Sequence, residues 1–139
     1  MEPDRLLEDW LRNFLGAHHA AAGTVHLRHG DVLTLHAAVN IPPKVREVTQ
    51  LIPRGKGMAG LAWERDRAVA TCNLKADSSG DVRPGAKAVD AQAAIAIPVR
   101  DGSGELRAVV GIAFGDERDF SEADLEHFER AAATLPSAP

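Results

Sequence analysis

The segment Gly55-Lys56-Gly57-Met58-Ala59-Gly60 has residue types and a spacing that could bind a phosphate. It reads as G-x-G-x-x-G, follows a possible short strand and precedes a helix that must end by Asp66-Arg67. Such a helix is too short to cross between parallel strands, as a dinucleotide-binding unit requires. The glycines therefore indicate a tight turn and a closely packed helix. The amides of Met58–Gly60, with Lys56 and Arg54, could still hold an anion.

Cys72 is the only cysteine of the chain. A catalytic thiolate needs a neighbouring base or a cationic setting, and the sequence offers no resolving cysteine. A lone cysteine directly after a short strand is more often a small buried hydrophobe. Both interpretations of Cys72 stay open. One cysteine does exclude an intramolecular disulfide framework and a cysteine-rich zinc site.

Positive charge gathers in the middle of an otherwise acidic chain. Residues 40–90 hold nine basic and six acidic side chains, whereas the whole protein has a formal net charge of −4. This excess indicates either a solvated surface or a site for a small anion, such as a carboxylate or a phosphate-bearing metabolite. If it is a site, we expect contacts from Arg54 and Lys56, and from Arg83 and Lys87 on the lid-like loop Asp77–Ala91. The absence of dense basic runs and of interleaved aromatics argues against nucleic acid as the partner.

Two terminal helices and two hairpins must position these residues. Helical spacing of apolar residues runs from Asp4 to about His18, and its wide stripe predicts a homodimer through the terminal helices: Leu6, Leu7, Trp10, Leu11, Phe14 and Leu15. The last helix begins at Ser121, which forms a capping-box pair with Asp124. Hairpins are expected over Thr24–Val39 and Ala93–Phe114. Between them Pro42-Pro43 breaks the chain, and Val48–Ile52 is a possible edge strand.

The hairpin registers decide which side chains share a face. A three-residue loop, His29-Gly30-Asp31, would put Leu27 opposite Leu33 and would place four polar residues on the other face: Thr24, His26, Thr34 and His36. His26 and His36 could then bind a metal, but no acidic or cysteine ligand shares that face, so we expect no metal site. In the second hairpin, pairing Val99 with Leu106 gathers a face of small residues that could front a pocket: Ala94, Ala96, Gly111 and Ala113.

Hairpins rather than βαβ units predict an α+β fold with a central antiparallel sheet of five to six strands. We expect both terminal helices on one face of this sheet and a ligand-pocket lobe, residues 45–90, on the other. The length fits a single domain over residues 1–139. No apolar run approaches the roughly 20 residues that cross a bilayer, and the N-terminus lacks a signal-peptide core. We therefore expect a cytoplasmic protein.

Several segments together resemble the GAF domains. They are Gly55–Ala62, Asn73-Leu74 with Asp77, Ala94–Val99 ending in Pro98-Val99, Gly111–Phe114, and Phe120–Leu125. The resemblance covers nearly the whole chain. It implies a GAF/PAS-like sheet with a ligand pocket, in a family that binds varied small molecules in signal transduction or serves only in dimerisation.

The resemblance favours a stand-alone, non-catalytic sensory module whose ligand and cofactor the sequence does not identify. Two alternatives stay open: a ligand-free dimerisation scaffold, and a thiol-dependent reductase using Cys72. The second resembles the free methionine-(R)-sulfoxide reductases, which rely on several cysteines. A separate output protein is a possible partner. The candidate ligand-binding residues are Arg54, Lys56, Met58, Trp63, Cys72, Asp77, Arg83, Lys87, Ala94 and Gly111.

Overall fold

A computed structural model of the chain describes residues 3–71, 93–116 and 118–136. Its helices are α1 (Pro3–His18), α2 (Pro43–Val48), α3 (Gly57–Arg65) and α5 (Glu122–Ala132). Its strands are β1 (Ala22–His29), β2 (Val32–Val39), β3 (Leu51–Pro53), β4 (Val69–Thr71), β5 (Ala93–Arg100) and β6 (Leu106–Phe114). The strands form one antiparallel sheet in the order β3-β2-β1-β6-β5-β4. This confirms the predicted α+β fold.

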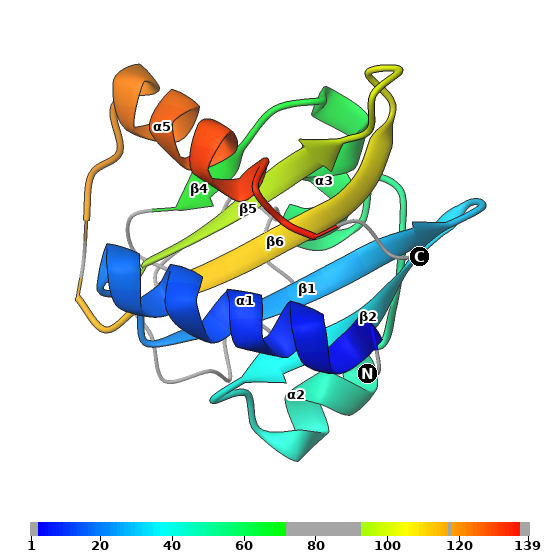
Figure 1. Cartoon of the computed structure of the whole chain (residues 1–139), viewed down its shortest axis with the longest axis horizontal. Coiled ribbons are helices and arrows are strands. Elements are labelled where there is room, and N and C mark those ends of the chain that lie inside the picture. Colours follow the sequence, from blue (N-terminus) through cyan, green and yellow to red (C-terminus); the bar gives the residue numbers. More distant parts are fainter. Residues whose placement is uncertain (1–2, 72–92, 117, 137–139) are drawn as a thin grey trace.

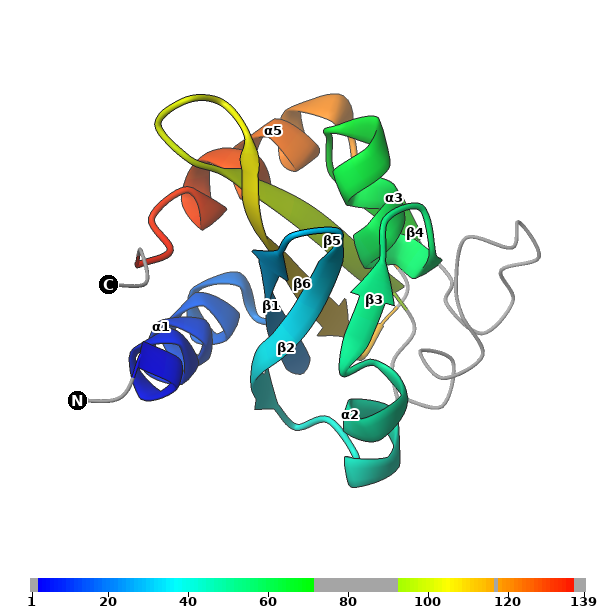
Figure 2. The same cartoon turned by 90° about the vertical axis from the view of Figure 1, so that its right-hand side faces the viewer.

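Helices α1 and α5 cover one face of the sheet, while α2 and α3 lie on the other (Figures 1 and 2). The spacing of Leu7, Leu11, Phe14 and Leu15 puts them on one side of α1, where all four are buried against the sheet. Helix α5 starts at the predicted capping box, in which the Ser121 hydroxyl and the Asp124 carboxylate each accept the other residue's backbone N–H. The placement of both terminal helices on one face was therefore predictable from their stripes.

A second, smaller core lies on the face that α3 covers. Trp63 is its largest member, and it packs with Leu33, Ile52 and Val109. The guanidinium groups of Arg28 and Arg54 lie over the Trp63 ring, 5.1 and 5.7 Å from its centroid. This cluster fixes α3 on the sheet.

The predicted register of the β1–β2 hairpin is wrong by one residue. His29 pairs with Val32 across a two-residue turn, and a bulge between Val25 and His26 restores the alternation. A slip of one residue moves side chains to the opposite face. His36 consequently faces α1, where its Nδ1 lies 2.6 Å from Asp4 Oδ1, whereas His26 faces the other way. The two histidines do not share a face.

The β5–β6 register differs from the prediction by two residues. Val99 pairs with Ala108, and a bulge next to it brings Arg100 opposite Leu106. Because side chains alternate with a period of two, this even shift leaves the side chains of Ala93–Val99 and Ala108–Phe114 on their predicted faces. Leu106, beyond the bulge, was predicted on the face of Val99 but packs in the core of the other face. The small residues therefore still line up, with Ala94 opposite Ala113 and Ala96 opposite Gly111.

Helix α2 is an element that the sequence interpretation missed. Pro42-Pro43 was expected only to break the chain, but Pro43 occupies the first turn of this helix. Proline suits that position because its backbone has no N–H to leave unpaired. The edge strand expected at Val48–Ile52 starts later, as β3, after α2 has ended.

Candidate functional site

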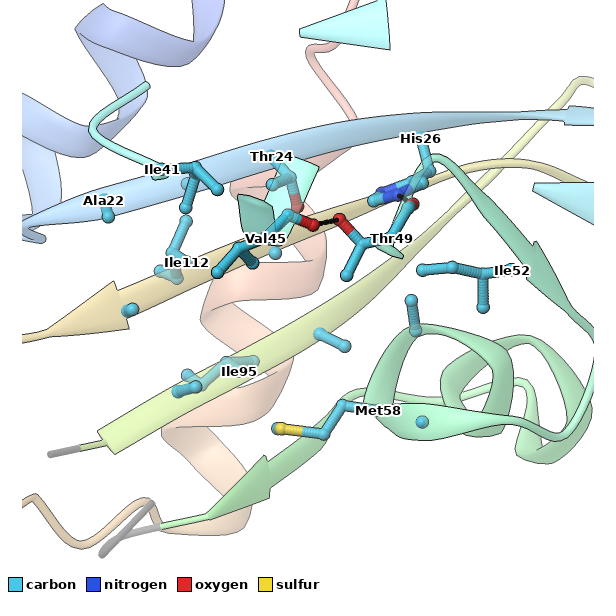
Figure 3. A pocket seen from close by; sticks show the side chains of 17 residues that line it. Ala22, Thr24, His26, Ile41, Val45, Thr49, Ile52, Met58, Ile95 and Ile112 are labelled. Carbon is cyan, nitrogen blue, oxygen red and sulfur yellow. Dashed lines mark hydrogen bonds between the residues drawn. The ribbon is translucent and has the colours of Figure 1, made fainter. Parts of the chain in front are cut away.

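A cavity of about 140 Å³ lies between the sheet and the lobe formed by α2, β3 and α3 (Figure 3). Its floor comes from three strands: Ala22, Gly23, Thr24 and His26 of β1, Ala94, Ile95 and Ala96 of β5, and Gly111, Ile112 and Ala113 of β6. Its roof comes from the lobe: Ile41, Val45, Thr49, Ile52, Gly57, Met58 and Ala59. The described lining contains no Lys, Arg, Asp or Glu.

Small side chains on the floor create the room for this cavity. Thr24 of β1, Gly111 of β6 and Ala96 of β5 form a row across the sheet, and Ala94 and Ala113 form the next. A Cβ on Gly111 would already come within 2.9 Å of Thr24 Oγ1. The predicted small-residue face thus borders a cavity rather than receiving a tightly packed helix.

The glycine turn holds α3 close enough to form the roof. A Cβ at Gly60 would lie 2.5 Å from the carbonyl oxygen of Pro53. Gly55 and Gly57 adopt φ angles of 83° and 64°, which glycine tolerates best. The Gly60 amide donates to the Lys56 carbonyl, so it is not available to an anion. These glycines therefore have the structural role that the sequence indicated.

His26 is the buried polar residue of the site, only 2% exposed. Its Nε2 lies 2.8 Å from the carbonyl oxygen of Thr49, which can only accept, so Nε2 carries the proton. Burial lowers the pKa of His26, against the smaller effect of this hydrogen bond, and His36 lowers it further. The ring is therefore neutral near pH 7, and Nδ1 is a bare acceptor. Within the described residues this enclosed Nδ1 has no hydrogen-bond partner.

Two threonines, Thr24 and Thr49, supply the side-chain hydroxyl groups of the described lining. The Thr49 hydroxyl donates to the carbonyl of Val45 at 2.7 Å, which ties it to the end of α2. Thr24 lies two residues before His26 on β1 and projects to the same side of the strand (Figure 3). The Thr24 hydroxyl makes no hydrogen bond to another described residue. Thr24 and His26 thus form a polar edge beside an apolar cavity.

The structure brings three of the candidate binding residues to the cavity, namely Met58, Ala94 and Gly111. It does not bring Arg54, Lys56 and Trp63 there: Arg54 and Lys56 are exposed, and Trp63 belongs to the core beside α3. The remaining four, Cys72, Asp77, Arg83 and Lys87, lie outside the described residues. The pair of basic residues nearest the glycine turn is therefore not part of the described lining.

The sequence interpretation missed His26, Thr24 and the whole roof from α2. A signal was present for the first two, since they alternate with Val25 and Leu27 on one strand. The wrong register placed them with Thr34 and His36 on a common polar face, which concealed their setting. No local signal connects His26 to the Thr49 carbonyl, because the partners are 23 residues apart.

The family model of the GAF domain matches this chain over residues 1–138. The chain belongs to the GAF domain family. The comparison with curated proteins returns no match. In this GAF domain, the described residues include no helix that is both long and apolar enough to cross a membrane. Nor do those residues group three or more His, Cys, Asp or Glu side chains that could hold a metal ion.

Solved structures similar to this GAF domain include enzymes and regulatory domains. Free methionine-R-sulfoxide reductase from Neisseria meningitidis, in complex with its substrate, superposes with a TM-score of 0.76 at 19% identity, over 96% of this chain and 75% of that one. The type II free methionine-R-sulfoxide reductase from Thermoplasma acidophilum superposes with a TM-score of 0.71 at 19% identity, over 97% of this chain and 94% of that one. The GAF domain of an Acinetobacter phosphoenolpyruvate-protein phosphotransferase superposes with a TM-score of 0.75 at 17% identity, over 97% of this chain and 80% of that one. Such low identities establish the fold and leave the activity open.

Proposed function

We propose that this GAF domain is a regulatory module that binds a small molecule in the cavity between the sheet and α2–α3, without catalysing a reaction. The observation that carries the proposal is the cavity itself. Concave, mostly apolar sites with few polar groups are typical of small-molecule binding. A close-packed interior would leave few voids of this size, and here a row of small residues keeps it open.

The described lining supports binding rather than catalysis. His26 is its one titratable side chain, and the Nε2 of that ring is engaged by Thr49. Nucleophilic catalysis needs a nucleophile and a base within hydrogen-bond reach, and the described lining offers no such pair. Binding would act on a partner by stabilising one arrangement of the lobe over the sheet.

The proposal is tested by ligand-observed NMR with a library of neutral and anionic fragments of one ring. We expect neutral fragments to bind in the millimolar to micromolar range, and to compete with one another for one site. An absence of binding by every fragment would leave the dimerisation scaffold as the better interpretation. Competition between fragments distinguishes binding in one cavity from weak binding at scattered surface positions, where fragments would not displace one another.

The reductase alternative rests on the fold shared with the Neisseria and Thermoplasma enzymes and on Cys72. It predicts turnover of free methionine-R-sulfoxide with dithiothreitol as the reductant, and loss of that turnover in Cys72→Ser. We expect no turnover by the wild-type protein. A rate above the buffer blank that Cys72→Ser abolishes would replace the binding proposal with the reductase.

A further inference from the structure

The polar edge formed by Thr24 and His26 indicates what chemistry a ligand must carry. Among the side chains of the described lining, these two hold the unengaged hydrogen-bonding atoms, because Thr49 Oγ1 is already bonded to Val45. An enclosed acceptor without a partner is unfavourable, because it has lost its hydrogen bond to water. A bound molecule that donates to Nδ1 would remove this penalty.

The atoms of this edge differ in what they can do. His26 Nδ1 can only accept while Nε2 is protonated and held by Thr49. Thr24 Oγ1 can donate as well as accept. A ligand group that both donates and accepts, such as a hydroxyl or a carboxamide, has the chemistry to pair with either atom. An ether or a hydrocarbon of the same shape leaves Nδ1 unpaired.

The size and charge of the site restrict the remainder of the molecule. An engineered apolar cavity of about 150 Å³ in another protein binds benzene, and the cavity here is about 140 Å³. A charged ligand would lose hydration without meeting an opposite charge in the described lining, which is costly in an apolar setting. The part of the ligand that lies inside the described cavity is therefore compact and apolar.

We infer that the ligand is a neutral molecule about the size of one ring, whose hydroxyl or amide group donates to His26 Nδ1 and accepts from Thr24. This inference rests on the proposed function and assigns the chemical class that the cavity selects. Thr24 and His26 are its specificity-determining residues. Met58, Val45 and Ile52 contact the apolar body.

The test compares phenol, toluene and benzoate by NMR titration near neutral pH. For the wild type we expect phenol to bind about three- to tenfold more tightly than toluene, the worth of one net hydrogen bond, and benzoate to bind least. In Thr24→Val the phenol preference should shrink toward unity. In Thr34→Val, the same change on β2 outside the described lining, it should persist.

His26→Leu should remove the preference for phenol entirely, and its melting temperature shows whether it folds. Thr24→Val decides the matter if His26→Leu does not fold. Equal binding of phenol and toluene by the wild type would overturn the inference and leave the small-molecule cavity standing. Preferential binding of benzoate would also overturn the inference, and it would support the anionic ligand that the charge pattern predicts. Failure of all three probes to bind would overturn the inference together with the proposed function.

Discussion

His26 gives this GAF domain a basic side chain that burial keeps uncharged. Its folded-state pKa lies below the ordinary 6.5. As the pH falls below about 6.5, the unfolded chain takes up a proton that the folded imidazole resists, so the free energy of unfolding decreases. We expect His26→Gln to lose stability less steeply than the wild type between neutral pH and the folded-state pKa. Urea unfolding at a series of pH values measures both slopes, and identical slopes would contradict this assignment.

Ala94 offers the cleanest way to fill the cavity. Its side chain lines the floor, so Ala94→Leu should abolish fragment binding while costing less than the ~1–3 kcal/mol typical of an overpacked core. Gly111→Leu makes the harsher comparison, because any Cβ there lies 2.9 Å from Thr24 Oγ1. Thermal melts with and without phenol check both variants. A collapse in the melting temperature of Ala94→Leu would mean that this face is closely packed.

At the scale of elements, the turn from β3 into α3 depends on the absence of a side chain at Gly60. Gly60→Ala places a Cβ 2.5 Å from the Pro53 carbonyl oxygen, and backbone cannot yield as a flexible side chain can. We expect a loss of about 1–3 kcal/mol in the free energy of unfolding. The matched control is Gly16→Ala in α1, where a Cβ meets nothing within 4 Å. This control should gain about 0.5–1 kcal/mol, as measured by urea unfolding.

At the scale of the whole molecule, α1 bears on how two copies could meet. The sheet buries Leu7, Leu11, Phe14 and Leu15, whereas Leu6 remains 39% exposed on the same helix. We expect a homodimer through α1 and α5, whose shared position on one sheet face is seen in Figure 1, because surplus apolar surface often marks an interface. Leu6→Asp should shift sedimentation toward the monomer. Leu51→Asp, at a 58% exposed residue on β3, should not.

Sedimentation of the wild-type protein can contradict this dimer prediction. A wild-type protein that sediments as a monomer at high concentration would leave Leu6 as an ordinary exposed residue, since single surface apolar groups are common. It would not affect the cavity, because α2 and α3, which contribute to its roof, lie across the sheet from α1 and α5 (Figure 2). The two proposals therefore stand or fall separately.

The sequence by itself determined the parts of this protein that depend on local spacing. The helical stripe of Leu7, Leu11 and Phe14 gave α1 and the face that it covers. The Ser121–Asp124 capping box gave the start of α5. The glycine turn gave α3, and the alternation of small residues in β5 and β6 gave the floor of the cavity even though the register was off by two. Each of these signals acts between residues close in the chain, and a period-two pattern survives an even shift.

Only the tertiary structure decided what closes the cavity and what is polar within it. The regular pairing of β1 with β6 puts Thr24 and His26 together on the cavity side of the sheet, whereas the bulge in the β1–β2 pairing separates His36 from them. The carbonyl that fixes the imidazole belongs to Thr49, after a helix that the sequence interpretation missed. Arg54 looked like a ligand contact because of its charge, yet it lies over Trp63. Such outcomes depend on pairs far apart in the chain. Hydrophobic alternation specifies a face, whereas register and long-range partners are fixed only when the whole core packs.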